Sequence, residues 1–402
     1  MAEPWLHVVG IGEDGEAGLS SAARRVLAQA EVIVGGDRHH RLASNDTAER
    51  IAWPSPFDAM IEAIEGLRGR RAVVLVTGDP LWYSVGARLS NPKYPRHVPA
   101  DQIAYHPQLS AFQWAACRMG WSLADCETLT AHGRPVEQVV PSFWPGARLL
   151  ILTAGPETPR EVAALLAERG WGASRLTVLA NLGGPDEGRI EGRAAGWDAE
   201  APPFHTLAVE VAGEGALLPR VPGLPDDAFA HDGTMTKREL RALTLAKLMP
   251  ARGALLWDIG AGCGSVSVEW MRAAPEARAI GIEPRADRRR MAEANAKALG
   301  TPALRLVEGE APAVLEGLPA PDAVFVGGGL SRETVEAALG ALKPRGRLVA
   351  NAVTLESEAL MAALHAEKGG ALIRLVPARA EAVGPYRGWR TGMPVTQWSL
   401  ST

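Results

Sequence analysis

The chain has 402 residues, of which 47% are hydrophobic and 22% are charged, and its formal net charge is -4. A chain of this length exceeds what a single core usually holds, so two domains are expected. The composition is that of a folded globular protein and excludes an intrinsically disordered chain, and the charge balance does not favour a nucleic-acid binder.

The sequence contains no apolar run long enough to span a bilayer and no signal-peptide pattern at its start. The three cysteines, Cys117, Cys126 and Cys263, lie far apart and form neither a CxxC pair nor a disulfide framework. Such spacing is typical of proteins from a reducing compartment. We therefore expect a cytoplasmic protein with no membrane partner and no nucleic-acid partner.

In the first half, β-branched runs alternate with alanine-rich stretches, which predicts an α/β unit. The expected helices cover 19–30 and 57–66, and another begins after Ser110, whose hydroxyl suits an N-cap. The expected strands cover 6–12, 31–36, 72–78, 148–152, 176–179 and 206–211.

The stretch 213–230 is rich in Gly and Pro and shows no apolar periodicity, which predicts a linker that buries little. The domains are therefore expected to span 1–212 and 231–402 and to separate near Pro219–Pro225. After the linker the alternation restarts and predicts a second α/β unit. Helices are expected at 236–249, 265–274, 285–300 and 334–342, and strands at 253–264, 277–284, 304–311, 321–329 and 346–353, with two more in the tail.

A glycine-rich turn, DIGAGCG, covers residues 258–264 where a strand ends and a helix begins. Glycines let the backbone turn sharply there, and the helix start offers unpaired amides to a ligand. Glu283 ends the next strand, where an acid can accept hydrogen bonds from both hydroxyls of a ribose. Each feature also has an ordinary explanation, since such turns are common and Glu283 fits a solvated surface acid.

Together, the turn, Glu283 and the acidic stretch 308–311 resemble the Rossmann-like S-adenosylmethionine methyltransferases. With DGTMTKRELR (232–241) and VGGG (326–329), residues 231–402 resemble the decarboxylating precorrin methyltransferase domain that acts at carbon 15. In that family, the segment before the first helix closes over the cofactor. The resemblance implies that S-adenosylmethionine is contacted by Thr236, Gly260, Ala261, Gly262, Cys263, Gly264, Glu283 and Ala311.

The first half carries VGIGEDGEAGLS (9–20), VTGDPLWYSVG (76–86), the loop before Ser110 and LILTAGPETP (150–159). Together they resemble the tetrapyrrole methylase family, whose two α/β subdomains hold S-adenosylmethionine in a cleft. The resemblance covers about 5–212 and implies cofactor contacts from Gly10, Gly12, Gly78, Asp79, Pro80, Ser110 and Ala111. The first turn lacks the proline of the family's GxGPG pattern, which leaves a structural or gating role open for that loop.

Other candidate residues are less informative. His39 and His40 are adjacent and lack an acidic or cysteine ligand set, so no metal site is expected. His132 and Arg134 suit either a structural role or a substrate contact. Near the tail, Arg379, Arg387 and Arg390 suit either anchors for substrate carboxylates or ordinary surface positions.

Taken together, the halves resemble the fused cobalamin-biosynthesis enzymes that methylate precorrin-6B at C5 and C15 and remove the C12 acetate carboxyl, giving precorrin-8. The resemblance implies a tetrapyrrole methylase fold of two α/β subdomains joined to a Rossmann-like methyltransferase fold. It also implies one S-adenosylmethionine per domain and a small-molecule tetrapyrrole substrate, and we expect a homo-oligomer. The catalytic residue stays unassigned. The alternatives are an RNA methyltransferase, which predicts a basic face, and a scaffold with one inactive half.

Overall fold

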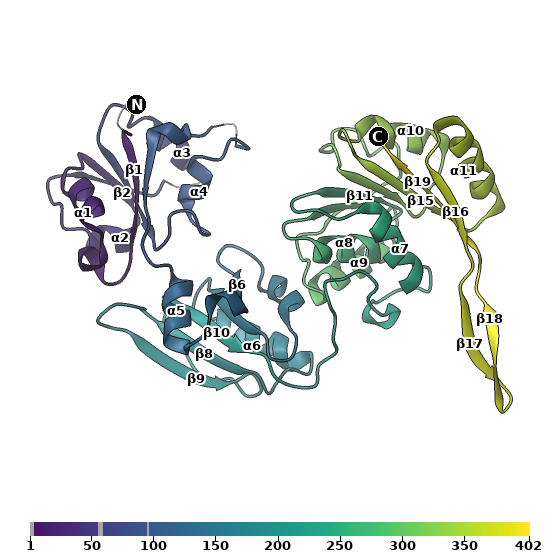
Figure 1. Ribbon diagram of the computed structural model, residues 1–402, viewed down its shortest axis with the longest axis horizontal. Helices are drawn as coiled ribbons and strands as arrows, with labels where there is room; N and C mark the ends of the chain where they lie inside the picture. Colours follow the sequence, from purple (N-terminus) through teal and green to yellow (C-terminus); the bar gives the residue numbers. More distant parts are fainter. Residues whose placement is uncertain (1–3, 55–58, 95) are drawn as a thin grey trace. The chain divides into compact units, whose positions relative to one another are not determined.

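The computed structural model describes residues 4–54, 59–94 and 96–402, and its chain divides into two compact units. The N-terminal unit takes the chain up to Val136 together with Ser142–Ala216, and the C-terminal unit takes Glu137–Pro141 with Leu217–Thr402. Figure 1 shows each unit as sheets covered by helices. Among the described residues, no helix is long and apolar enough to cross a membrane.

The N-terminal unit begins with a parallel sheet in the order β3-β2-β4-β1-β5. In β1, Val8 joins a cluster with Met60 of α3, and the next residue, Val9, joins another with Leu27 of α1. Alternate residues thus face two helix layers, as a parallel sheet requires. The elements are Leu6–Ile11 (β1), Ser21–Ala28 (α1), Val32–Gly35 (β2), Asp37–Leu42 (α2), Glu49–Ala52 (β3), Met60–Glu65 (α3), Ala72–Thr77 (β4), Val85–Leu89 (α4) and Ile103–His106 (β5).

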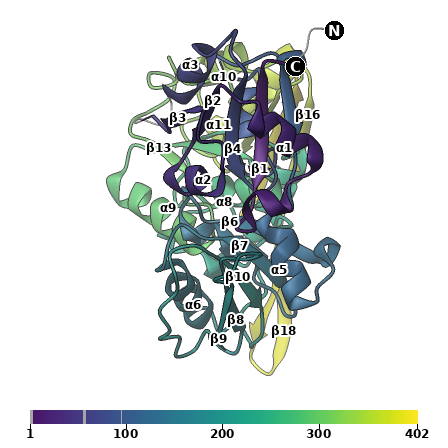
Figure 2. The same cartoon turned by 90° about the vertical axis from the view of Figure 1, so that its left-hand side faces the viewer.

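A second sheet completes this unit in the order β6-β7-β10-β8-β9, with only the β6–β7 pair parallel. Figure 2 shows α5 and α6 on opposite sides of it. Ser110 caps α5 as expected, because its hydroxyl accepts a hydrogen bond from the Gln113 amide. The elements are Ala111–Met119 (α5), Cys126–Thr130 (β6), Arg148–Leu152 (β7), Thr158–Glu168 (α6), Arg175–Ala180 (β8), Gly188–Arg193 (β9) and His205–Glu210 (β10).

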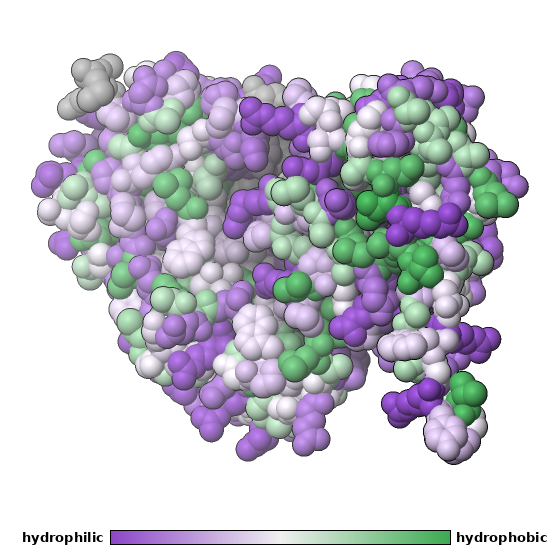
Figure 3. Space-filling view, turned by 45° about the vertical axis from the view of Figure 1, so that its right-hand side comes forward, coloured by the Kyte–Doolittle hydropathy of each residue, from purple (hydrophilic) through white to green (hydrophobic). Residues whose placement is uncertain are grey.

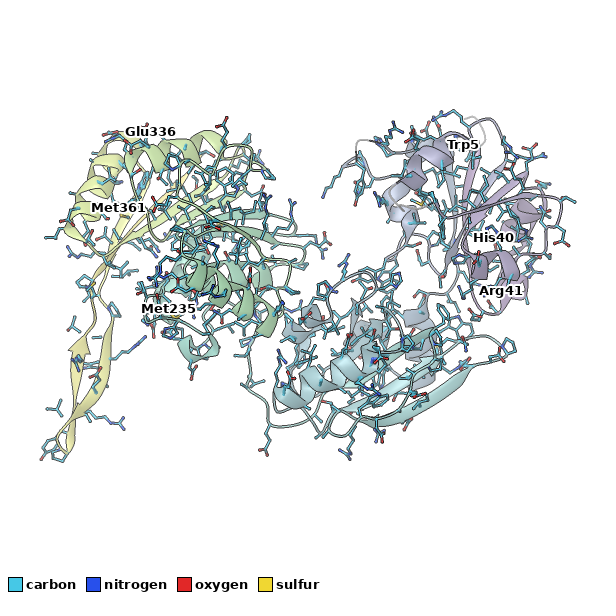
Figure 4. The ribbon with its side chains drawn as sticks, turned by 180° about the vertical axis from the view of Figure 1, so that it is seen from behind. Trp5, His40, Arg41, Met235, Glu336 and Met361 are labelled. Carbon is cyan, nitrogen blue, oxygen red and sulfur yellow. The ribbon has the colours of Figure 1, made fainter. Side chains whose placement is uncertain are left out.

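The C-terminal unit holds one sheet in the order β13-β12-β11-β14-β15-β19-β16, antiparallel only at β19. Trp270 of α8 packs on one face, and Met361 of α11, labelled in Figure 4, packs on the other. The elements are Arg238–Leu248 (α7), Leu255–Ile259 (β11), Ser265–Ala273 (α8), Arg278–Ile282 (β12), Ala286–Ala298 (α9), Arg305–Val307 (β13), Ala323–Val326 (β14), Arg332–Ala341 (α10), Arg347–Ala352 (β15), Leu355–Lys368 (α11), Ala371–Leu375 (β16) and Val395–Ser401 (β19).

The tail contains more structure than the two expected strands. Besides α11 and the sheet strands β16 and β19, it forms a separate antiparallel hairpin of Ala378–Val383 (β17) and Tyr386–Thr391 (β18). Figure 1 shows the hairpin projecting from the C-terminal unit. Its residues are mostly exposed, so no core face imposes the alternation that would have marked these strands in the sequence.

The stretch 213–230 also differs from the expected linker. Leu224 and Phe229 are 1% and 4% exposed and pack in a cluster with Val268 of α8. The amides of Gly223 and Leu224 donate to the carboxylate of Glu269 at 2.6 and 2.9 Å. The expectation that this stretch buries little is therefore wrong, because 217–230 is part of the C-terminal unit. The helix expected at 57–66 is α3, and residues 57 and 58 of that expectation lie outside the described residues.

Candidate cofactor and substrate sites

A cavity of about 1070 Å³ lies at the carboxyl edge of the C-terminal sheet. Its position follows from the topology, because the chain runs from β11 outward to β13 and then places β14 on the other side of β11. Loops leave the sheet in opposite directions at such a reversal, which opens a crevice for a ligand. The cavity is lined by seven residues expected to bind the cofactor, namely Thr236, Gly260, Ala261, Gly262, Cys263, Glu283 and Ala311.

Glycines make the turn after β11 possible. The φ angles of Gly260 and Gly262 are 72° and 57°, in the left-handed region that favours glycine. A Cβ on Gly260 would lie 2.6 Å from the Gly328 amide nitrogen, so this turn touches the glycine turn after β14. A Cβ on Gly262 would meet nothing closer than the Thr234 carbonyl oxygen, at 3.9 Å. The space above Gly262 is therefore open to a ligand.

Gly264 was also expected to contact the cofactor, but it lies outside the cavity lining. It is the N-cap of α8, with a φ of 77°. A Cβ there would lie 2.9 Å from the Cβ of Ala292 on α9. Close packing of α8 against α9 is therefore enough to explain this glycine.

Glu283 is 3% exposed, so it is not a solvated surface acid. Its Oε2 accepts a hydrogen bond from the Gly262 amide at 2.9 Å, and its Oε1 accepts one from the Arg285 amide at 3.0 Å. These two bonds fix the plane of the carboxylate at the cavity wall. Each oxygen keeps a lone pair that can accept from a ligand hydroxyl.

Asp258, at the end of β11, is 1% exposed and also lines the cavity. Its Oδ2 accepts from the backbone amide and the hydroxyl of Ser267 at 3.0 and 2.7 Å. Its Oδ1 has no hydrogen-bond partner among the residues that the structure describes. Burial, together with a smaller effect of the nearby Glu283, raises the pKa of Asp258 to about 6, although the hydrogen bonds from Ser267 act to lower it. A cationic ligand would favour the ionised form.

Arg241 holds the segment that carries Thr236. Its guanidinium is fully buried and donates to the Thr236 carbonyl at 2.7 Å and to Glu269 at 2.6 Å. It also donates to the Leu224 carbonyl and stacks on Phe229. Arg241 is the last residue of the DGTMTKRELR segment, but its side-chain role was not predicted, because an arginine on a helix is usually exposed.

These residues fit S-adenosylmethionine. The cavity volume of about 1070 Å³ is slightly above the roughly 300–1,000 Å³ range of small-molecule sites. Two buried acids, Asp258 and Glu283, suit a cationic ligand that carries a ribose, and the open space above Gly262 admits its close approach. When bound, the cofactor supplies a methyl group that its sulfonium has already activated.

Cationic side chains also line this cavity, and Met235, labelled in Figure 4, lies among them near the base of the hairpin. Arg379 and Arg390, proposed from the sequence as anchors, are lining residues, whereas Arg387 is not. Three further cationic lining residues were not predicted as anchors, although one of them, Lys237, lies within the DGTMTKRELR segment. They are Lys237, Arg285 and Arg288.

The N-terminal unit has a much smaller cavity, of about 30 Å³, between its two sheets. Three expected residues line it: Gly12, Gly78 and Ala111. The other four lie outside the lining. Gly10 packs against the Gly78 carbonyl, Asp79 accepts from the Leu81 amide at 2.7 Å, Pro80 packs against Gly86, and Ser110 caps α5.

An ion pair between Glu13 and Arg38 lies in this N-terminal cavity wall. The Arg38 guanidinium also donates to the Thr77 hydroxyl at 3.1 Å and stacks 4.1 Å from the ring centre of Phe204. A space of about 30 Å³ holds one or two waters and not S-adenosylmethionine. Cofactor binding at this cavity therefore requires these side chains to move.

The other histidines and Arg134 singled out in the sequence make local contacts. The imidazole Nε2 of His39 lies 3.0 Å from the Thr77 hydroxyl, and that of His40 lies 3.2 Å from the Ile51 carbonyl oxygen. Within the described part of the chain, no group of three or more His, Cys, Asp or Glu residues is placed to hold a metal. His132 is exposed, and Arg134 stacks on Tyr83 at 5.7 Å.

Comparisons with known proteins identify both units. Residues 5–196 match the family described as Tetrapyrrole (Corrin/Porphyrin) Methylases, and residues 227–402 match the Precorrin methyltransferase domain. The fold and the sites therefore define an S-adenosylmethionine-dependent methyltransferase of tetrapyrroles. This confirms the fold class expected from the sequence.

Full-length relatives narrow the class. The precorrin-6Y C(5,15)-methyltransferase (decarboxylating) of Sinorhizobium sp. is 48% identical over 404 residues, which cover 99% of this chain and 97% of the relative. The protein of that name from Mycobacterium tuberculosis H37Rv is 40% identical, covering 98% of this chain and 99% of its own. A crystal structure of the C-terminal domain from Rhodobacter capsulatus is 53% identical, with a TM-score of 0.44, and covers 46% of this chain and all of its own. The chain belongs to the precorrin-6Y C(5,15)-methyltransferase (decarboxylating) family.

Proposed function

We propose that this chain methylates precorrin-6B, called precorrin-6Y in the names of its relatives, at C5 and C15 and removes the C12 acetate carboxyl, giving precorrin-8. The observation that carries this proposal is the match of both units, over nearly the whole chain, to relatives named for that activity. The N-terminal unit, which contains most of residues 1–212, acts at C5, and the C-terminal unit, which contains residues 231–402, acts at C15. The expected cytoplasmic location and homo-oligomeric state stay predictions.

Each domain binds its own S-adenosylmethionine in this proposal. In the C-terminal unit, the support is a large cavity with two buried acids and an open glycine turn. In the N-terminal unit, the support is that Gly12, Gly78 and Ala111 line one space, which must widen to admit the cofactor. Transfer to an electron-rich meso carbon needs mainly alignment and exclusion of water, so the chain's residues position the reactants.

Decarboxylation belongs to the C-terminal unit, because C15 adjoins the ring that carries the lost acetate. One bound pose can then present both reacting positions to the same cavity. The acetate loses its carboxyl as carbon dioxide, the conjugated ring accepts the electron pair, and a proton replaces the carboxyl. A cavity that holds the ring can also orient the breaking bond perpendicular to it.

The test uses the full chain with precorrin-6B and labelled S-adenosylmethionine, and counts methyl groups and carbon dioxide by mass. Gly78→Ala and Gly260→Ala form a matched pair, because both glycines have positive φ and little space for a Cβ. The Gly78 variant should keep carbon dioxide release and add one methyl group. The Gly260 variant should release no carbon dioxide and should add at most one methyl group. Carbon dioxide release that survives in the Gly260 variant but fails in the Gly78 variant would overturn the assignment.

A further inference from the structure

The hairpin of β17 and β18 presents two arginines to the C-terminal cavity. Arg379 lies directly opposite Arg390 in the antiparallel register, and both line the cavity together with Glu381. Alternate residues of a strand point to opposite faces, so Arg387, which pairs with Ala382, lies on the other face of the hairpin. The cavity thus receives one arginine from each strand and not the third.

Like charges directly opposite each other destabilise a strand pair, so this arrangement opposes the stability of the hairpin. Each arginine is neutralised by a carboxylate: Arg379 contacts Glu239 of α7 at 2.8 Å, and Arg390 contacts Glu381 at 3.0 Å. The arginine side chains are 54% and 77% exposed. Exposed ion pairs contribute little stability, so a ligand carboxylate can replace either partner at little cost.

The two deeply buried charged groups of the cavity are acids, whereas the charges at its rim are of both signs and include the hairpin arginines and Glu381. The acids Asp258 and Glu283 are almost fully buried at the carboxyl ends of β11 and β12, whereas the hairpin arginines are exposed at the rim. Lys237, another lining residue, makes no ion pair with any residue that the structure describes. Figure 3 shows hydrophilic side chains on the hairpin and an area of apolar side chains on the unit above it. A ligand with an apolar ring and anionic side arms matches this distribution.

We propose that Arg379 and Arg390 form a clamp for two carboxylates of the tetrapyrrole substrate at the rim of the C-terminal cavity. The clamp exchanges Glu239 and Glu381 for substrate carboxylates and so fixes the macrocycle edge relative to the glycine turn after β14. Planar guanidinium groups suit this role because each can bind a carboxylate through two hydrogen bonds. The proposal rests on the proposed function, since it assigns the substrate anchor of the same site.

The test compares three full-length variants that each remove one charge from the same hairpin: Arg379→Gln, Arg390→Gln and, as the matched control, Arg387→Gln. Uroporphyrin, a stable porphyrin with many carboxylates, is the binding probe, and its methyl ester is the uncharged counterpart. We expect the dissociation constant for uroporphyrin to rise about tenfold in each of the first two variants. The control variant Arg387→Gln should change the dissociation constant for uroporphyrin less than twofold.

Two further readouts separate binding from folding. Because the first two variants relieve repulsion between opposed arginines, their thermal midpoints should equal or exceed that of the wild type. The variants should also raise KM for precorrin-6B with little change in kcat, and their affinity for the methyl ester should match that of the wild type.

Equal uroporphyrin affinity in all variants, or an equal loss in Arg387→Gln, would overturn the clamp. A wild-type chain that fails to bind uroporphyrin also counts against it. A wild-type chain that fails to methylate precorrin-6B overturns the proposed function itself, so the two failures are distinguishable.

Discussion

The carboxylate of Glu283 and the amide of Gly262 form a hydrogen bond of 2.9 Å that joins the end of β12 to the glycine turn after β11. The bond brings the acid and the turn to one wall of the C-terminal cavity. The two residues lie 21 positions apart in the chain. Parallel pairing of β11 with β12 brings them together, because the carboxyl ends of both strands lie at the same edge of the sheet.

Replacing Glu283 tests whether the two cofactor sites are independent. Glu283→Ala removes the acceptor of the buried Gly262 amide and the proposed ribose contacts, so the C-terminal site should bind S-adenosylmethionine roughly 10- to 100-fold more weakly. Two-site calorimetry on the full chain should find about two cofactors per wild-type chain, with the N-terminal site unchanged in the variant. Glu308→Ala, at an acid that is 75% exposed, is the control. Equal weakening at both sites contradicts independence.

The Glu13–Arg38 pair is expected to oppose cofactor binding in the N-terminal unit. Glu13→Ala removes the partner that holds Arg38 in the small cavity, so the affinity of this unit for S-adenosylmethionine should rise by up to about fivefold. Calorimetry checks this against Glu187→Ala, which breaks the Arg118 pair elsewhere in the unit. A lower affinity in Glu13→Ala means that Glu13 contacts the cofactor instead.

The raised pKa of Asp258 predicts a pH-dependent cost in stability. The folded carboxyl ionises near pH 6 and the unfolded one near 3.8, so the unfolded chain loses its proton first as pH rises. Wild-type stability should therefore fall relative to Asp258→Asn between about pH 4 and pH 6, by about 3 kcal/mol. Urea unfolding of both proteins without cofactor measures the difference at each pH. If the difference in stability between the two proteins does not change with pH, Asp258 is ionised in the folded protein over the whole range.

The boundary between the units should lie before Leu217 and not within 219–225. A fragment of residues 226–402 lacks the amides of Gly223 and Leu224, which donate hydrogen bonds to the Glu269 carboxylate. It also lacks the Leu224 carbonyl, which accepts a hydrogen bond from Arg241. It should therefore be less stable than 217–402 by at least about 2 kcal/mol. Urea unfolding followed by circular dichroism compares the two fragments. Equal stability means that residues 217–225 contribute nothing to the fold.

The sequence alone predicted the class of fold, because alternating strand and helix patterns and two sets of loop motifs are local features. Seven of the eight residues predicted around the C-terminal site line one cavity, since all of them except Thr236 follow strands that end at the same edge of the sheet. Of the seven residues predicted to bind the cofactor in the N-terminal unit, three line the small cavity: Gly12, Gly78 and Ala111. In this unit Ser110 is the N-cap of α5, a role that its position before an alanine-rich stretch also predicted.

What only the tertiary structure decided concerns contacts between residues far apart in the chain. The linker became part of a core because Leu224 and Phe229 meet Val268, and no periodicity marks a segment that is buried in an irregular conformation. Arg379 and Arg390 face the cavity while Arg387 does not, because the register of β17 with β18 sets which side chains share a face. Residue type and spacing determine local structure. Which side of the hairpin an exposed arginine points to depends instead on the register between the two strands, and the local sequence pattern does not specify that register.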